Sequence, residues 1–109
     1  FVHRNSALVD GGIEICEGVF WGGNFEQVIT LLDSNVLKPE EIKFFVGYSG
    51  WGAGQLQSEM ELNSWIICRN ARIEQIFDTQ VETLWKEVLG TMGGKFKIIS
   101  NFPVDPRLN

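Results

Sequence analysis

The chain has 109 residues, a length that suits a single domain with one hydrophobic core. Its hydrophobic fraction of 44% and charged fraction of 21% are those of an ordinary soluble globular protein. No apolar run is long enough to cross a membrane, and no signal peptide is visible. The net charge of −5 and the scattered positions of the nine Lys and Arg residues argue against direct binding to nucleic acid.

Few side chains suit a catalytic or metal site. His3 is the only imidazole, so neither a serine–histidine–aspartate triad nor a zinc site is expected. Cys16 and Cys68 form no C-x-x-C pair. We expect them to be buried free thiols, and a disulfide between them is the alternative. Glu59 and Glu61 do not share a helix face, which disfavours acid–base catalysis by this pair. The sequence therefore predicts no enzyme activity, no metal and no cofactor.

The first third of the chain predicts a hairpin followed by a helix. Residues 8–9 and 13–15 flank the turn residues Asp10-Gly11-Gly12, and the second strand is expected to run on to Phe20. Asn24 can cap a helix that ends near Ser34. Its apolar residues fall at helical spacing and are expected to face the core: Phe25, Val28, Ile29 and Leu32.

The middle of the chain alternates strand-like and glycine-rich segments. A turn at residues 38–41 precedes residues 42–48, which read IKFFVGY and are the best candidate for a central buried strand. A short helix over residues 55–62 follows a glycine loop. Residues 65–68 predict another strand, and residues 69–78 predict irregular chain with one helical turn.

The C-terminal part predicts the clearest helix of the chain. Thr79 and Glu82 have the spacing of a capping box, and the amphipathic helix that follows is expected to end at the glycines of residues 93–94. Residues 95–98 alternate lysine with apolar side chains and predict an edge strand. Residues 101–109 predict a loosely held tail. Hairpin strands mixed with about three helices indicate an α+β fold in a single domain, residues 1–109.

The run from residue 47 to residue 65 is the best candidate for a binding site. Its glycines specify a loop shape, its aromatic residues supply contact area, and its polar residues supply selectivity for a protein or a small polar ligand. The candidate residues are Tyr48, Gly50, Trp51, Gly54, Gln55, Glu59, Asn63 and Trp65. A structural role is the alternative, in which both tryptophans pack the helix onto the sheet while the amides satisfy loop backbone groups.

Nucleotide binding by this loop is disfavoured. Gly50, Gly52 and Gly54 lie between a strand-like and a helix-like segment, as in a phosphate-binding turn. A dinucleotide fingerprint needs its third glycine at position 55, where this chain has Gln55. The acidic residues that follow have the wrong charge for a phosphate.

The stretch GYSGWGAGQLQSEMELNSW resembles the signature of the bacterial AlgH/YqgE family, roughly G-Y-x-G-W-x-x-G-Q-L-E-x-E-I-x-x-N-x-W. The matching residues are Gly47, Tyr48, Gly50, Trp51, Gly54, Gln55, Leu56, Glu59, Asn63 and Trp65. Gln57 replaces a glutamate of the family, and Met60 replaces a branched aliphatic residue. The loss of that glutamate weakens any mechanism that needs paired carboxylates. With its flanks, the similarity covers about residues 1–94.

The resemblance implies a cytoplasmic α+β protein with a mixed, largely antiparallel, barrel-like sheet. Members of this family are often labelled transcriptional regulators, although their molecular activity is unresolved. The N-terminal half of the family pattern has no counterpart here. The chain is therefore expected to be the C-terminal portion of a longer protein and to self-associate through exposed apolar surface.

The leading functional hypothesis is a non-catalytic module that binds a protein partner or a small polar ligand and acts indirectly on transcription. The net charge and the absence of a basic helix-turn-helix favour this indirect role over direct DNA binding. A direct DNA-binding regulator is one alternative. An enzyme that needs groups from the missing N-terminal half is the other.

Overall fold

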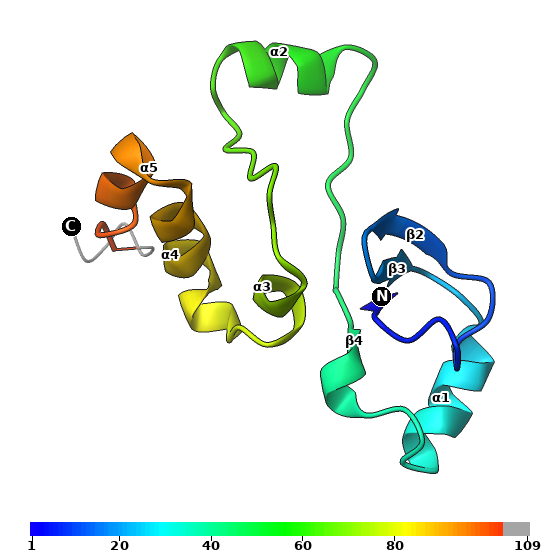
Figure 1. The fold of residues 1–109 in the computed structure, drawn as a ribbon. Coiled ribbons are helices and arrows are strands. Elements are labelled where there is room, and N and C mark those ends of the chain that lie inside the picture. The colour runs from blue at the N-terminus through cyan, green and yellow to red at the C-terminus, as the bar shows by residue number, and fades with distance from the viewer. Residues whose placement is uncertain (104–109) are drawn as a thin grey trace.

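The computed structural model describes residues 1–103, so most of the predicted loosely held tail lies outside the described residues. Figure 1 shows three regions, namely a small sheet with one helix, a helix at the end of two long extended segments, and a group of three helices. The radius of gyration is 16.7 Å. A compact chain of this length would have a value of about 13 Å. The predicted α+β class is confirmed, and the regions are loosely joined.

The sheet has four strands in the order β2-β3-β1-β4, and every neighbouring pair is antiparallel. The strands are β1 (Val2–His3), β2 (Ile13–Cys16), β3 (Val19–Trp21) and β4 (Ile42–Lys43). Within residues 1–103 this sheet does not close into a barrel, in contrast to the barrel-like sheet that the family resemblance implies.

The hairpin lies later in the chain than predicted. Strands β2 and β3 form it, and the turn falls at Glu17 and Gly18, where Gly18 has a φ of 75°. The prediction of a hairpin centred on residues 10–12, with one strand continuing to Phe20, is therefore wrong. A two-residue turn that contains glycine suits the twist of an antiparallel pair, and the sequence carries that signal at both places.

The turn at Asp10 instead contacts the start of helix α1 (Phe25–Asp33). The Asp10 amide donates to the Oε1 atom of Gln27 at 2.8 Å, and the Asp10 carbonyl accepts from the Asn24 amide at 2.9 Å. Gly23 precedes this contact with a φ of 124°, and an added Cβ there would lie 2.9 Å from the Asp10 carbonyl oxygen. These bonds hold Val9 against the core rather than in a strand.

Helix α1 matches its prediction at both ends. The Asn24 side chain accepts from the Gln27 amide at the start, and Ser34 caps the end. Of the four residues expected to face the core, Phe25 and Ile29 are exposed, so that part of the prediction is wrong. The buried cluster consists of Val9, Val28, Leu37 and Ile42.

Strand β4 is much shorter than predicted. A 3₁₀ turn, η1 (Pro39–Glu41), leads into it as expected, but the strand ends at Lys43. Residues 44–48 are exposed, so the prediction of a buried strand over residues 42–48 is wrong beyond Lys43. Antiparallel pairing joins β4 to β1 only at Ile42 and Lys43, and residues 44–48 have no partner in the described sheet.

Helices α2 (Gln55–Glu61) and α3 (Ile73–Phe77) agree with the predicted short helix and helical turn. The strand predicted over residues 65–68 is absent from the described structure, where this segment is extended and has no neighbour with which to pair. Cys16 is exposed and Cys68 is half-buried, and both are free thiols. The prediction of buried thiols is therefore wrong, and the alternative disulfide is not formed.

Helix α4 (Val81–Met92) is the long helix that the sequence predicts, and Gly93 ends it with a φ of 72°. The predicted capping box is wrong, because the hydroxyl of Thr79 donates to Glu87 and Gln80 occupies the cap position without a side-chain bond. The predicted edge strand is also wrong. Residues 95–98 lie in helix α5 (Gly94–Ile99), which packs on α4.

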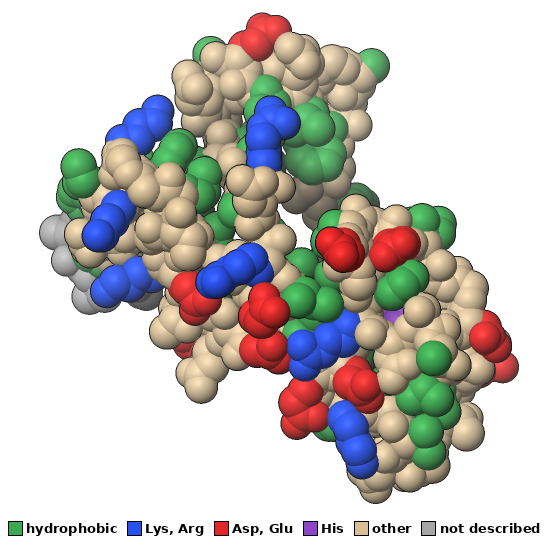
Figure 2. All heavy atoms as spheres, in the orientation of Figure 1, with side chains coloured by type: hydrophobic (Ala, Val, Ile, Leu, Met, Phe, Trp, Pro, Cys, Tyr) green, Lys and Arg blue, Asp and Glu red, His purple; other side chains and the backbone are tan. Residues whose placement is uncertain are grey.

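Two basic side chains of the sheet bind the helical region. Arg4 forms an ion pair with Asp78 at 2.8 Å, and its guanidinium lies 5.1 Å from the ring centre of Phe77. The ammonium group of Lys43 donates to the carbonyl of Ile76 at 2.8 Å. Figure 2 shows Lys, Arg, Asp and Glu side chains gathered where these two regions meet. Arg4 and Lys43 therefore join the two regions through polar contacts.

Candidate functional site

The predicted site lies on the part of the chain that projects farthest. Figure 1 shows α2 at the top of the molecule, joined to the rest by two extended segments. We call residues 47–65 the loop–helix. Gly54 begins the helix with a φ of 77°, a backbone conformation that glycine adopts without steric cost. No residue of α2 is buried, so local contacts must hold the shape of the loop–helix.

Three of those contacts are hydrogen bonds to one carboxylate, that of Glu59. The indole nitrogens of Trp51 and Trp65 both donate to the Oε2 atom of Glu59, at 3.2 and 2.7 Å. The side-chain amide of Gln55 donates to the Oε1 atom of Glu59 at 2.9 Å. Both oxygens of the carboxylate therefore accept hydrogen bonds from side chains on either side of it in the sequence. We call these four residues the Glu59 cluster.

The same bonds set the charge and shape of the Glu59 cluster. Hydrogen bonds from Trp65, Gln55 and Trp51 lower the pKa of Glu59, because they stabilise its ionised form. The Oε1 atom of Gln55 also accepts from the amide of Gly52 at 3.1 Å, which fastens the glycine loop to the helix. The two indole rings meet edge to face, with centroids 5.7 Å apart. Glu59 thus remains ionised and holds the loop closed.

Four residues of the predicted site lie outside the cluster, namely Tyr48, Gly50, Gly54 and Asn63. Tyr48 is 96% exposed, and its ring lies beside Gly50, where an added Cβ would come within 3.3 Å of it. Asn63 has a φ of 56° and ends the helix, with its amide donating to the carbonyl of Met60 at 3.1 Å. The structure therefore brings together four of the eight predicted residues and gives Gly54 and Asn63 roles in the backbone.

The structural alternative is half right. Gln55 does satisfy a loop backbone group, as that alternative expects. The tryptophans do not pack α2 onto the sheet, because they contact each other and Figure 1 shows α2 well away from the strands. Trp51 and Trp65 each remain 42% exposed. Aromatic surface is therefore available beside an ordered polar cluster.

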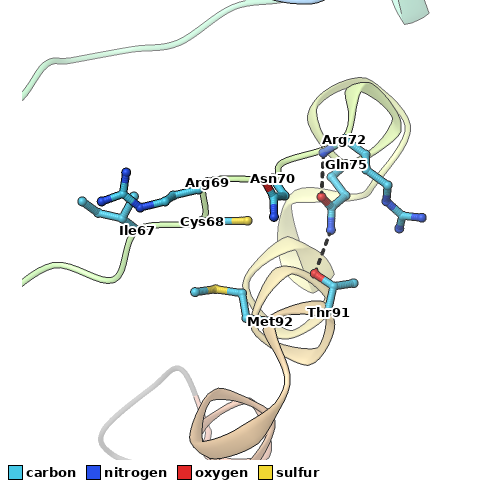
Figure 3. A pocket seen from close by; sticks show the side chains of 8 residues that line it. All are labelled: Ile67, Cys68, Arg69, Asn70, Arg72, Gln75, Thr91 and Met92. Carbon is cyan, nitrogen blue, oxygen red and sulfur yellow. Dashed lines mark hydrogen bonds between the residues drawn. The ribbon is translucent and has the colours of Figure 1, made fainter.

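A pocket that the sequence analysis did not predict lies between residues 67–72 and the end of α4. It has a volume of about 530 Å³ and is drawn in Figure 3. Gln75 is 2% exposed there, accepts from the Arg72 amide at 2.9 Å and donates to the Thr91 hydroxyl at 3.3 Å. The lining residues are Ile67, Cys68, Arg69, Asn70, Arg72, Gln75, Thr91 and Met92. The available sequence signal was Gln75, an amide between the apolar residues of α3.

The side chains that line this pocket do not form an evident reactive or charged site. Figure 3 shows the guanidinium groups of Arg69 and Arg72 directed away from the space between Cys68 and Met92. The hydrogen bonds of Gln75 join α3 to α4, so this amide holds the wall together. Within residues 1–103, no three His, Cys, Asp or Glu side chains are grouped so that they could hold a metal ion. No helix in this part of the chain is long and apolar enough to cross a membrane.

The geometry defines an α+β protein whose best candidate for contact is a projecting loop–helix rather than a deep cavity. Comparison with known proteins identifies the family. Residues 1–97 match the family described as AlgH-like, and the chain belongs to it. The resemblance carried by the loop–helix sequence is thereby confirmed.

The names of the curated relatives state no activity. A UPF0301 protein of Chlorobium limicola is 45% identical, and the match covers 100% of this chain and 58% of the relative. A UPF0301 protein of Cytophaga hutchinsonii is 41% identical over 99% of this chain and 59% of the relative. The chain thus spans somewhat more than half the length of these relatives. No solved structure matches the chain significantly.

Proposed function

We propose that this chain is a non-catalytic binding module whose loop–helix contacts a protein partner. The Glu59 cluster carries the proposal. Its carboxylate accepts three side-chain hydrogen bonds within the loop–helix, so these polar groups maintain a shape. The indole faces and Tyr48 remain exposed on that ordered support. Exposed Trp and Tyr side chains on a rigid frame are typical of the residues that dominate protein–protein contacts.

A protein suits this surface better than a small polar ligand. Small ligands bind in concave sites that enclose most of their surface. Pockets of about 240 to 530 Å³ lie elsewhere among the described residues, and no residue of the Glu59 cluster lines them. The projecting loop–helix offers aromatic surface for contact but does not enclose a small ligand. The small-ligand form of the hypothesis therefore has less support.

We further propose that the chain acts in the cytoplasm, as the family resemblance implies, and influences transcription only through its partner. The net charge of −5 works against binding to phosphates, so a direct regulator would need a local basic surface. A gel-shift titration over a range of salt concentrations tests this point. A shift that weakens steeply with salt would favour the alternative of direct DNA binding.

Enzyme activity is the other alternative. The only imidazole, that of His3, is fully buried in the sheet, where it cannot reach a substrate. The carboxylate of Glu59 is ionised and already hydrogen-bonded, which suits a structural acceptor better than a proton donor. These observations support a module that binds without catalysis.

Crosslinking in cells tests the proposed contact. A photoreactive benzoylphenylalanine replaces Tyr48, whose exposed ring tolerates a larger aromatic group. The matched control places the same group at Ile98, an exposed apolar residue of α5. We expect a discrete crosslinked protein at position 48 and none at position 98. The same product at both positions, or no product at 48, would contradict the proposal.

A further inference from the structure

We propose that the loop–helix binds an arginine-bearing segment of its protein partner, with the guanidinium group stacked on an exposed indole face of Trp51 or Trp65 beside the carboxylate of Glu59. This inference rests on the proposed function and adds the chemistry of the partner. Its evidence is the charge of the loop–helix, the open faces of its two indole rings and the hydrogen bonds that those rings make.

The loop–helix and its flanks carry only negative charge. Between Lys43 and Arg69, the sequence contains Glu59 and Glu61 and no lysine or arginine. Within residues 1–103, neither of these carboxylates forms an ion pair. Figure 2 shows acidic side chains at the top of the molecule, where Figure 1 places α2. Two uncompensated negative charges on a projecting segment attract a cationic partner and repel an acidic one.

The two indole rings leave faces open to a cation. They meet edge to face, so the edge of one ring covers a single face of the other, and each tryptophan remains 42% exposed. The cation–ring contacts found within residues 1–103 involve the rings of Phe77 and Phe96. No cation of the described chain therefore lies over Trp51 or Trp65. Tryptophan is the aromatic side chain that attracts a cation most strongly.

The hydrogen bonds of the Glu59 cluster strengthen this attraction. Both indole nitrogens donate to the Oε2 atom of Glu59. A ring N–H that donates to an anion is polarised, so electron density moves into the ring and its faces become more negative. An apolar side chain placed here would desolvate the carboxylate without offsetting its charge, which costs free energy. A cation offsets that charge, so the ring faces and the carboxylate favour the same kind of partner.

Arginine suits this surface better than lysine does. The guanidinium group is planar and weakly hydrated, so it stacks on an aromatic face while its N–H groups still donate to a neighbouring acceptor. An ionised carboxylate has about four acceptor positions. Side chains of the loop–helix fill two on the Oε2 atom of Glu59 and one on its Oε1 atom. The remaining position on Oε1 can accept from the guanidinium group.

Titration with an acetylated and amidated Gly-Arg-Gly-Arg-Gly peptide tests this chemistry through the indole N–H resonances. We expect saturable shifts of the Trp51 and Trp65 signals that weaken as salt is added. Trp21 and Trp85 are internal controls, because they are 57% and 45% exposed and donate to no carboxylate in the described structure. Their signals should not move. A peptide with citrulline in place of arginine has the same shape without the charge and should bind at least about fivefold more weakly.

A pair of charge reversals tests the role of the negative field. Glu61 is exposed and lies outside the Glu59 cluster, so Glu61→Lys should leave the loop–helix folded and weaken the arginine peptide at least about threefold at low salt. Glu82→Lys is the matched control at an exposed position of α4 and should leave the affinity unchanged. Equal affinities in the two variants would overturn the proposal, as would equal binding of the citrulline peptide or unmoved indole signals.

The crosslink at position 48 separates this inference from the proposed function. Mass spectrometry identifies the segment of the partner that carries the link, and we expect arginine within a few residues of it. A discrete partner linked through a segment without arginine would leave the proposed function standing and overturn this inference. A link to a second copy of this chain would also overturn it. The absence of any product at position 48 would contradict the proposed function and this inference with it.

Discussion

The sheet with α1 and the region of α3 to α5 differ in how far they bury their apolar side chains. The first region encloses a cluster of Val9, Val28, Leu37 and Ile42. In the second, Leu89 is buried, while Val81 and Trp85 on the same helix are exposed. Both regions have clear amphipathic patterns in sequence. The difference shows that an apolar helix face becomes a core only where another element covers it.

The loop–helix extends this comparison to a region with no buried residue in its helix. The Glu59 cluster holds it together with hydrogen bonds rather than with apolar packing. Exposed hydrogen bonds contribute less to global stability than buried apolar groups do. The three regions should therefore respond differently to substitution, in the order that follows.

The largest expected effect is on the core of the first region. Leu37 is fully buried, so Leu37→Ala should lower the free energy of unfolding by about 3 kcal/mol, through lost transfer energy and the cavity left behind. Leu62→Ala is the matched control in the loop–helix, where the side chain is exposed, and should cost less than about 0.5 kcal/mol. Urea unfolding followed by far-ultraviolet circular dichroism measures both. Equal losses would show that the loop–helix is buried in solution.

A pair of glycines should show effects of opposite sign. Gly23 has a φ of 124°, and an added Cβ would press on the Asp10 carbonyl, so Gly23→Ala should cost about 2 kcal/mol. Gly90 lies inside α4 with open space around it, so Gly90→Ala should stabilise the chain by about 0.5–1 kcal/mol. Thermal unfolding of the two variants provides the test. A destabilised Gly90→Ala variant would mean that this side of α4 is covered.

A residue of the first region, His3, should also make the stability of the chain depend on pH. Burial lowers the pKa of His3 below 6.5, so near that pH the unfolded chain binds a proton more readily than the folded chain does. The stability that this residue contributes is complete above pH 6.5 and declines as the pH falls through 6.5 toward the folded pKa. Urea titrations between pH 5 and 7.5 should show this slope in the wild type and not in His3→Leu.

A second decline at lower pH separates other groups from His3. Hydrogen bonds from the Lys38 amide and the Asn5 side chain lower the pKa of Glu41 below 4.5. Its contribution is present above pH 4.5 and is lost as the pH falls below that value. His3→Leu should leave this second decline intact. An unchanged slope above pH 5 in that variant would assign the first decline to a different group.

The smallest effect on global stability, and the most local signal, is expected at Glu59. Glu59→Ala removes the acceptor of both indole groups, so the indole N–H resonances of Trp51 and Trp65 should shift and tryptophan emission should move to the red. Glu61→Ala is the control, because this substitution on the same helix removes only the hydrogen bond from the Gln57 side chain. Heteronuclear spectra of the indole groups would resolve the two cases. Unmoved indole signals in Glu59→Ala would contradict the cluster.

The sequence predicted elements whose signals are local. Asn24, the glycine pair at residues 93–94 and the apolar spacing of α4 gave correct helices, because caps and amphipathic periods act within a few residues. Trp51, Gln55, Glu59 and Trp65, which converge in the structure, are four of the eight predicted site residues, and all four lie on one short helix and its flanks. The function that we assign to this cluster remains a prediction.

Several of the errors concern contacts between distant segments. Residues 42–48 have the composition of a central strand, yet only Ile42 and Lys43 find a neighbour. Residues 95–98 alternate like a strand and form α5 against α4 instead. The pocket beside Gln75 was missed because its walls come from residues 67–75 and from the end of α4. A strand or a pocket depends on what lies next to it, and a single segment does not encode that.

The sequence by itself therefore determined the family, the α+β class and the main helices. Tertiary structure alone decided which apolar segments are buried, where the sheet ends, and that residues 44–48 are exposed. The physical reason is the range of the forces. Capping and helix periodicity act along the chain, whereas strand pairing and burial require a partner surface brought in by the fold.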